Sequence, residues 1–120
     1  HMEIKIANKN YTLYFGWDFL DKINYHFGVK VESEGQEINT RAGGMAFMES
    51  GLGMNDPITV VKVIQSATAT ESQKPSVVNI RKFVEGLLVD DQKAYKEFVK
   101  ELADEIKKEP MLKALTALNK

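Results

Sequence analysis

The sequence predicts an α+β domain, with an N-terminal β-hairpin followed by a mainly helical bundle of about five or six helices. Residues 3–15 form two short runs in which apolar and polar residues alternate, as is typical of half-buried strands. From Trp17 onward the apolar residues recur at helical spacing. The chain has 120 residues, of which 43% are hydrophobic, and no long linker interrupts it. We therefore expect one domain over residues 3–120.

The hairpin strands are expected at residues 3–7 and 11–15, each with an apolar face. Asn8-Lys9-Asn10 should form the turn, because asparagine tolerates positive φ and bonds to its own backbone. Gly28 is expected to follow the first helix as its C′ residue. Two strands alone are marginally stable in water, so this hairpin must pack on helices or on another chain.

The helices are bounded by recognisable start signals. Asp56-Pro57 combines an N-cap carboxylate with proline at the first helical position, which favours a helix over the strand that the β-branched residues after it would allow. Ser76 is a further N-cap candidate, Asp90-Asp91 opens the helix that follows, and Asp104 and Lys108 are spaced for an i,i+4 ion pair. The elements expected after the hairpin are a helix at 17–27, a loop or short irregular hairpin at 29–38, and helices at 40–54, 57–70, 76–89, 91–108 and 111–118.

Composition excludes several classes of function. The 16 basic and 17 acidic residues give a formal net charge of −1, which argues against a general nucleic-acid or membrane binder. Without cysteine there is no disulfide framework and no thiol nucleophile. The longest apolar stretch, 58–64, is far shorter than the roughly 20 residues of a membrane helix. His1-Met2 is typical of an expression-tag remnant, and no secretory signal follows it, so we expect a soluble intracellular protein.

The residues that could carry out chemistry are few. Once His1 is set aside, His26 is the only histidine, and it lies in no metal-ligand spacing. Asp18 and Asp21 share a helix face near its N-terminus, where carboxylates normally complement the helix dipole. The glycines between 43 and 53 match no phosphate-binding loop. The sequence therefore predicts no catalytic residue, no metal site and no cofactor.

One apolar segment is better suited to binding. Its five large apolar residues lie among four glycines, each of which weakens a helix by up to about 1 kcal/mol relative to alanine. Flexible thioether side chains suit surfaces that accept varied apolar partners. The alternative is that these side chains simply fill gaps in the core. The candidate partner-binding residues are Met45, Phe47, Met48, Leu52 and Met54.

Two stretches resemble a known family. The step Phe15-Gly16-Trp17-Asp18-Phe19-Leu20-Asp21 after the hairpin resembles the start of tail assembly chaperones of siphophages and prophages of Gram-positive bacteria. The similarity continues through Gly51-Leu52-Gly53-Met54-Asn55-Asp56-Pro57-Ile58 and weakens after Pro75. This resemblance implies a non-enzymatic protein that binds the phage tape measure protein and keeps it soluble while the tail tube assembles around it. It brings no catalytic or ligand signature, so it assigns no role to any residue.

The resemblance also sets expectations for partners and location. It implies the tape measure protein as partner, the tail-tube protein as a second candidate, and the cytoplasm of the bacterial host rather than the mature virion as location. Another phage structural protein, such as a head–tail connector or a tail terminator, is the main alternative. A small nucleic-acid-binding regulator is the second, although the near-neutral charge argues against it. An exposed hairpin edge would also permit a homo-oligomer.

Overall fold

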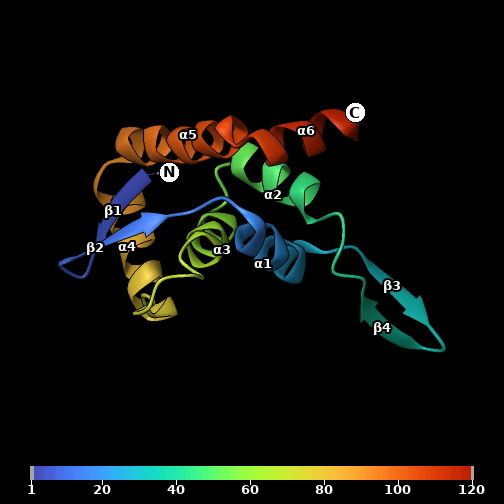
Figure 1. Cartoon of the computed structure of the whole chain (residues 1–120). Coiled ribbons are helices and arrows are strands. Elements are labelled where there is room, and N and C mark those ends of the chain that lie inside the picture. Colours follow the sequence, from blue (N-terminus) through green and yellow to red (C-terminus); the bar gives the residue numbers. More distant parts are fainter. Residues whose placement is uncertain (1, 120) are drawn as a thin grey trace.

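Two hairpins and six helices make up residues 2–119, the part of the chain that the computed structural model describes (Figure 1). The predicted α+β class is confirmed, with 61% of residues in helices and 15% in strands. The elements in chain order are β1 (Met2–Ile6), β2 (Lys9–Leu13), α1 (Trp17–Phe27), β3 (Lys30–Ser33), β4 (Gln36–Asn39), α2 (Gly44–Gly53), α3 (Pro57–Ala67), α4 (Val77–Asp90), α5 (Gln92–Lys108) and α6 (Pro110–Leu118).

The first hairpin has its turn earlier in the chain than predicted. Ile6 pairs with Lys9, so the turn is formed by Ala7 and Asn8 and not by Asn8-Lys9-Asn10. Both turn residues have positive φ, 50° and 65°, as the tightest hairpin turns require. The strands pair antiparallel, and one face of the hairpin is buried over α3 and α4. The buried side chains of this face are those of Met2, Ile4, Ile6, Tyr11 and Leu13.

Helix α3 is the centre of the core. It packs against α1, α2, α4 and strand β2, and Figure 1 shows it surrounded by these elements. The predicted cap is confirmed: the Asp56 carboxylate accepts hydrogen bonds from the Thr59 amide at 3.1 Å and from the Thr59 hydroxyl at 2.8 Å. Val60, Val63 and Ile64 are completely buried. Burial on nearly all sides explains why this helix could carry so many β-branched residues.

Helices α4 and α5 begin where their cap signals indicated. The Ser76 hydroxyl accepts from the Asn79 amide at 3.1 Å, and the Asp91 carboxylate accepts from the Ala94 amide at 3.0 Å. Pro110 occupies the first turn of α6. The predicted partner of Lys108 was wrong: its ammonium lies 3.2 Å from the carboxylate of Glu105, one position nearer than Asp104 (i,i+3). Both spacings place side chains on one helix face, so the pattern alone could not separate them.

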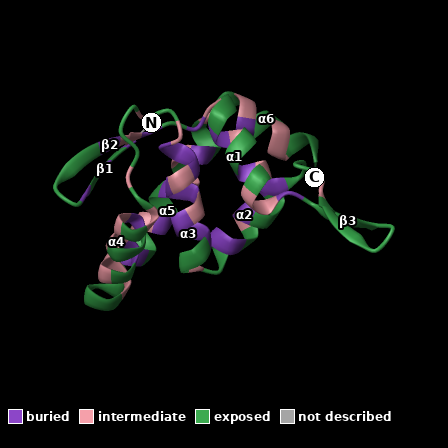
Figure 2. Cartoon of the chain, turned by 90° about the horizontal axis from the view of Figure 1, so that it is seen from below, coloured by how far each residue is buried: buried purple, intermediate pink, exposed green. Residues whose placement is uncertain are grey.

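The polar stretch after α1 forms the second hairpin, which was one of its two predicted forms. Strands β3 and β4 project from the end of α1 away from the other elements (Figure 1), and nearly all of this hairpin is exposed (Figure 2). Gly28 directly follows α1, as predicted, but with φ of −57° it does not adopt the left-handed conformation that is common at this position. Glycine is required here because the backbone of α1 lies too close for a side chain: a Cβ would lie 2.3 Å from the Asn24 carbonyl oxygen.

Candidate functional site

The structure divides the predicted binding segment into core and surface residues. Met45, Met48 and Leu52 are buried on the inner face of α2, as the core-filling alternative describes. Phe47 and Met54 are 58% and 72% exposed. A partner can therefore reach Phe47 and Met54 directly, whereas Met48 and Leu52 are only 0% and 5% exposed and lie beneath a groove beside α2.

This groove lies between α2 and α5 and has a volume of about 490 Å³. Its inner surface is apolar, and its rim carries charges of both signs. The apolar residues that line it are Met48, Leu52, Val99, Ala103 and Ile106. The charged residues at its rim are Glu49, Lys96, Glu97, Lys100 and Lys107. We refer to it below as the α2–α5 groove.

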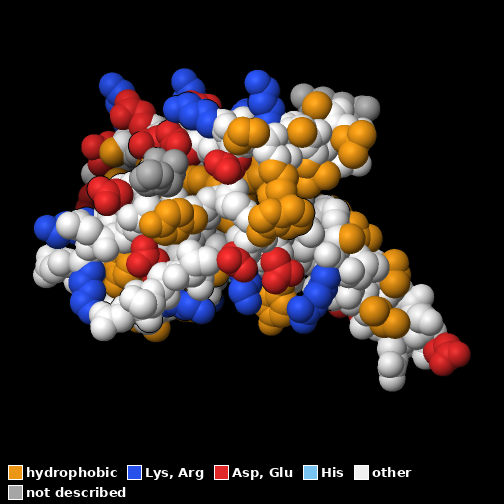
Figure 3. Space-filling view, in the orientation of Figure 1, with side chains coloured by type: hydrophobic (Ala, Val, Ile, Leu, Met, Phe, Trp, Pro, Cys, Tyr) orange, Lys and Arg blue, Asp and Glu red, His pale blue; other side chains and the backbone are white. Residues whose placement is uncertain are grey.

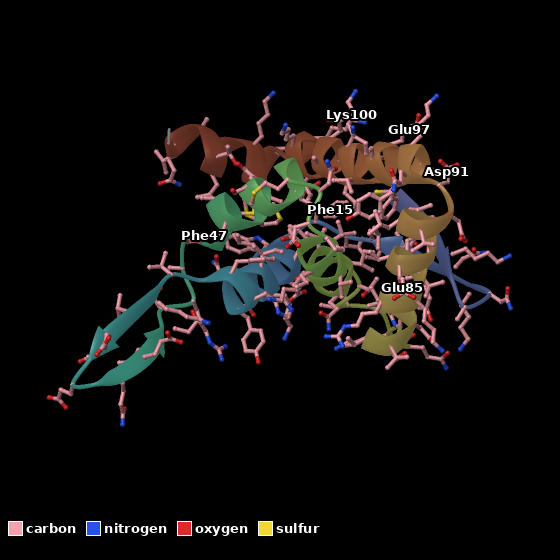
Figure 4. All side chains as sticks on the ribbon, turned by 180° about the vertical axis from the view of Figure 1, so that it is seen from behind. Phe15, Phe47, Glu85, Asp91, Glu97 and Lys100 are labelled. Carbon is pink, nitrogen blue, oxygen red and sulfur yellow. The ribbon has the colours of Figure 1, made fainter. Side chains whose placement is uncertain are left out.

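The pattern of α5 explains how one helix supplies both surfaces. Val99 and Ile106 turn toward the core. Lys100 and Lys107 each follow one of these residues in the chain, and Lys96 lies one helical turn before Lys100, so the three lysines share a neighbouring side of the helix. Figure 3 shows basic side chains along the edge formed by α5 and apolar side chains gathered beneath them over α2. Figure 4 shows the rim residues Glu97 and Lys100 on α5. The groove is thus a strip of apolar surface bordered by charge.

A buried tyrosine fixes one end of the groove. The Tyr95 hydroxyl donates a 2.8 Å hydrogen bond to the carbonyl oxygen of Asn55, which joins α5 to the turn between α2 and α3. Asn55 itself is left-handed, with φ of 56°, and its carbonyl therefore faces α5 rather than continuing α2. Burial, and then the nearby Asp56 carboxylate, raises the pKa of the Tyr95 hydroxyl. The hydroxyl therefore stays protonated and remains a donor at neutral pH.

Gly51 sets how closely α2 approaches α3, a role that was not predicted from the sequence. A Cβ at this position would lie 2.1 Å from the Thr59 hydroxyl oxygen and 2.9 Å from the Thr59 Cβ. Only glycine lets the two helices meet at this depth. The signal was present in the sequence, because Gly51 lies three residues after Met48 on the same core-facing side of the helix.

A second depression lies on the other side of α2, against α1 and α6, with a volume of about 560 Å³. Glu49 borders both depressions. Its carboxylate accepts a 3.0 Å hydrogen bond from the Thr116 hydroxyl of α6. This contact ties the end of α6 to α2 and separates the two depressions.

The residues considered for chemistry do not come together. Within residues 2–119 no group of three or more histidine, cysteine, aspartate or glutamate side chains is placed to hold a metal ion. Asp18 and Asp21 are both exposed. His26 is partly buried, and burial, followed by the charges of Lys62 and Lys22, lowers the pKa of its imidazole. In the same described part of the chain, no helix is long and apolar enough to cross a membrane.

Comparison with known proteins places the whole fold in one family. The family model described as "Phage tail assembly chaperone protein, TAC" matches residues 3–118, which includes both hairpins and all of the helices above. Neither the curated proteins nor the solved structures contain a significant match. The match covers almost the full length of the chain and agrees with the family that the sequence resembles. The chain belongs to the phage tail assembly chaperone family.

Proposed function

We propose that this protein binds the tape measure protein of a siphophage or prophage and keeps it soluble while the tail tube assembles. The family match supports tail assembly as the process. The α2–α5 groove supports the mode of binding. A protein as long as a tail exposes apolar helical stripes until tube subunits cover them, and a groove with an apolar floor can shield such a stripe in the meantime.

The dimensions and chemistry of the groove favour a helix as its occupant. Its floor runs along α5 through Val99, Ala103 and Ile106, a length of two helical turns. A bound helix would place apolar residues at positions i, i+3/i+4 and i+7 on this floor. The rim carries three lysines and two glutamates, so the flanks of the helix would be mixed in charge with an acidic excess. Phe47 and Met54, both exposed on or next to α2, do not line the groove and form a separate apolar surface that a partner could contact.

The remaining parts of the proposal follow from the family. Tail assembly chaperones are not a class of enzymes, and we propose that this chain likewise acts by binding alone, without nucleotide, metal or nucleic acid. It would act in the cytoplasm of the host and leave before the virion is complete. The tail-tube protein is a second candidate partner, to be tested beside the tape measure protein.

Co-expression tests the function. The tape measure protein of the same phage should move from the insoluble to the soluble fraction when this chain is co-expressed, and should be retained with it on an affinity column. The tail-tube protein, expressed in the same way, provides the comparison. An equally insoluble tape measure protein with and without this chain would contradict the proposal.

Groove variants test the site. Ala103→Glu places a charge on the floor at a partly buried position, and Lys96→Glu with Lys100→Glu reverses the rim at exposed positions. Both should reduce the soluble tape measure protein, whereas Lys93→Glu, on the same helix but outside the groove, should not. Circular dichroism shows whether each variant is folded. If Phe47→Ser with Met54→Ser abolishes binding while the groove variants bind normally, the partner uses the exposed apolar residues and not the groove.

Analysis of particles separates this proposal from the alternatives. A head–tail connector or tail terminator stays in the virion, so mass spectrometry of purified particles should detect it. Stoichiometric amounts of this chain in mature particles would contradict the assignment as an assembly factor. A gel shift that weakens steeply with salt would instead support nucleic-acid binding.

A further inference from the structure

Helix α6 is attached to the rest of the molecule by a small apolar contact. Of its nine residues, all within the described part of the chain, only Leu112 is buried. Met111 and Leu115 are half-buried against the core, and Leu118 is 79% exposed. A helix of this length is marginally stable in water unless packing supports it. The stability of α6 therefore depends on a small contact area.

The space between α6 and its neighbours is incompletely filled. The second depression, with its volume of about 560 Å³, lies between α6 and the helices α1 and α2. Where the chain enters α2, the side chains that line this depression are too short to reach α6. These residues are Ala42, Gly43, Gly44 and Ala46. The hydrogen bond from the Thr116 hydroxyl to the Glu49 carboxylate, 3.0 Å long, joins the two helices across this space.

The connection between α5 and α6 can act as a hinge. Only Glu109 separates the two helices, and its backbone is extended, with φ of −67° and ψ of 117°. Pro110 has no amide hydrogen, so it cannot continue the hydrogen bonds of α5 into α6. The helical bonds of α6 begin at the Glu109 carbonyl oxygen, which accepts from the Lys113 amide at 2.9 Å. A rotation at Glu109 would therefore move α6 as a unit and leave the hydrogen bonds of α5 intact.

The apolar side of α2 runs from the α2–α5 groove to the space beneath α6. Met45, Met48 and Leu52 lie at positions i, i+3 and i+7, and so on one side of the helix. Met48 and Leu52 line the α2–α5 groove, whereas Met45 lines the second depression together with Leu115 of α6. Figure 1 shows α6 beside α2, beyond the end of α5. Movement of α6 away from α2 would join the two depressions into one longer apolar surface.

The apolar residues of α6 have the spacing of a helix that docks in a groove. Met111, Leu115 and Leu118 lie at positions i, i+4 and i+7. This is the spacing expected above for a partner helix in the α2–α5 groove. On α2, α6 thus takes the position that the end of a longer partner helix would take.

We propose that α6 is a hinged lid over α2, which opens at Glu109-Pro110 to admit a partner helix and closes when the partner leaves. The closed lid covers the Met45 end of the apolar side of α2, and the open lid gives the partner the whole length of this side. The partner rests on the proposed function, whereas the opening of α6 is a property of this chain alone. The two parts are therefore tested separately.

Hydrogen exchange of the purified chain tests the opening. The amides of residues 113–118 should have protection factors at least about tenfold lower than those in the middle of α5, and similar to one another, because they open together. Low concentrations of urea should change these values little, since opening of the lid exposes little surface. Exchange of α6 only together with α5 would overturn the proposal. So would protection that falls steadily toward Leu118, because that is the pattern of a frayed end.

A crosslink that holds the lid closed tests access to α2. The chain has no cysteine of its own, and the side-chain oxygens of Glu49 and Thr116 lie 3.0 Å apart. In Glu49→Cys/Thr116→Cys, a short bifunctional thiol reagent can therefore join α6 to α2. The crosslinked form should lose the fast exchange of α6. It should also retain at least about tenfold less of a tape measure segment on an affinity column than the same variant before crosslinking.

A matched control carries its crosslink on the first hairpin. Glu3 and Thr12 are direct cross-strand partners, so Glu3→Cys/Thr12→Cys accepts the same reagent away from α6, and crosslinking should not change how much of the segment it retains. Equal retention by both forms of the lid variant would overturn the proposal and leave the proposed function standing. A wild type that retains none of the segment would instead contradict the proposed function, and hydrogen exchange would still decide whether α6 opens as a unit.

Discussion

The two hairpins of this molecule have similar local chemistry and opposite surroundings. Both are antiparallel, both alternate apolar and polar residues, and both turn through residues with positive φ. The first buries Ile4, Ile6 and Leu13 over α3 and α4, whereas the second leaves Val31 and Ile38 half-exposed. The comparison teaches that alternation predicts a strand but does not say what its apolar face will cover.

The second hairpin is held in place by contacts at its base and not by the packing of one of its faces. The Asn39 side chain donates to the Tyr25 carbonyl oxygen at 3.0 Å and accepts from the Arg41 amide at 2.8 Å. The Thr40 hydroxyl donates to the Val29 carbonyl oxygen at 2.7 Å, and the Arg41 guanidinium lies 5.1 Å from the centre of the Tyr25 ring. These polar contacts fix where the hairpin leaves α1, while Val31 and Ile38 stay exposed.

The largest expected difference between the hairpins comes from the same substitution in each. Ile6 is 1% exposed, so Ile6→Ala should lower the free energy of unfolding by about 2–5 kcal/mol, through lost burial and the cavity left behind. Ile38 is 46% exposed, so Ile38→Ala should change it by no more than about 0.5 kcal/mol. Urea denaturation of both variants checks the pair, at a protein concentration where the wild type is monomeric. Equal losses would mean that the second hairpin also has a packed face within the monomer.

The glycines on either side of α1 give the next largest difference. Gly16 joins the first hairpin to α1, and nothing lies within 4 Å of a Cβ built there. At Gly28, which leads to the second hairpin, a Cβ would lie 2.3 Å from the Asn24 carbonyl oxygen and 2.5 Å from the Asn39 side-chain oxygen. We expect Gly28→Ala to cost about 1–3 kcal/mol through the forced backbone shift, and Gly16→Ala to cost less than about 1 kcal/mol.

Thermal and urea unfolding measure the loss for the two glycine variants. Hydrogen exchange then shows where Gly28→Ala acts, because its effect should concentrate on the amides at the base of the second hairpin. A Gly28→Ala variant as stable as Gly16→Ala would mean that the base of the hairpin is not closely packed.

A smaller effect is expected from the charges that face each other in the second hairpin. Glu32→Lys replaces a repulsive cross-strand pair with an attractive one and should stabilise the hairpin by about 0.2–1 kcal/mol. Slower hydrogen exchange of the β3 and β4 amides would report it. Glu34→Lys, which makes the same charge change in the turn, should slow exchange less. If both variants slow exchange equally, the gain comes from net charge and not from the Glu32–Glu37 pair.

Most of the fold could be predicted because its signals are local. Asp56, Ser76 and Asp91 cap helices as their residue types indicated, and the helical period located α1 and α5. The first turn was misplaced because the favourable residues Asn8 and Asn10 lie on either side of Lys9, and only the strand register decides between two turns.

The candidate site could be predicted only in part, because a groove needs two elements. The binding segment in α2 was recognisable from its composition, but which of its side chains face inward depends on α3 and α5. Gly51 shows why: a glycine at this point of the sequence suggests a weak helix, and only the position of Thr59 reveals a close contact between α2 and α3. Nothing in the spacing of the charged residues of α5 indicated that they would border an apolar groove shared with α2.

The smallest expected effect concerns His26, at the end of α1 next to the second hairpin. Its imidazole lies edge to face with the rings of Tyr25 and Phe27, and burial, then Lys62 and Lys22, lower its pKa below the ordinary value of about 6.5. The unfolded chain therefore binds the proton at higher pH than the folded chain does, and stability falls as pH drops from about 6.5 through the lowered pKa. His26→Gln should remove this part of the pH dependence. Subtracting the pH profile of its free energy of unfolding, measured by urea denaturation, from that of the wild type separates the contribution of His26 from that of the carboxylates.

Lys22→Gln should raise the pKa of His26 toward its ordinary value in an NMR titration and weaken the pH dependence of stability. A His26 that titrates at or above about 6.5 in the folded wild type would mean that the end of α1 is open to water, and that the base of the second hairpin is looser than its hydrogen bonds indicate.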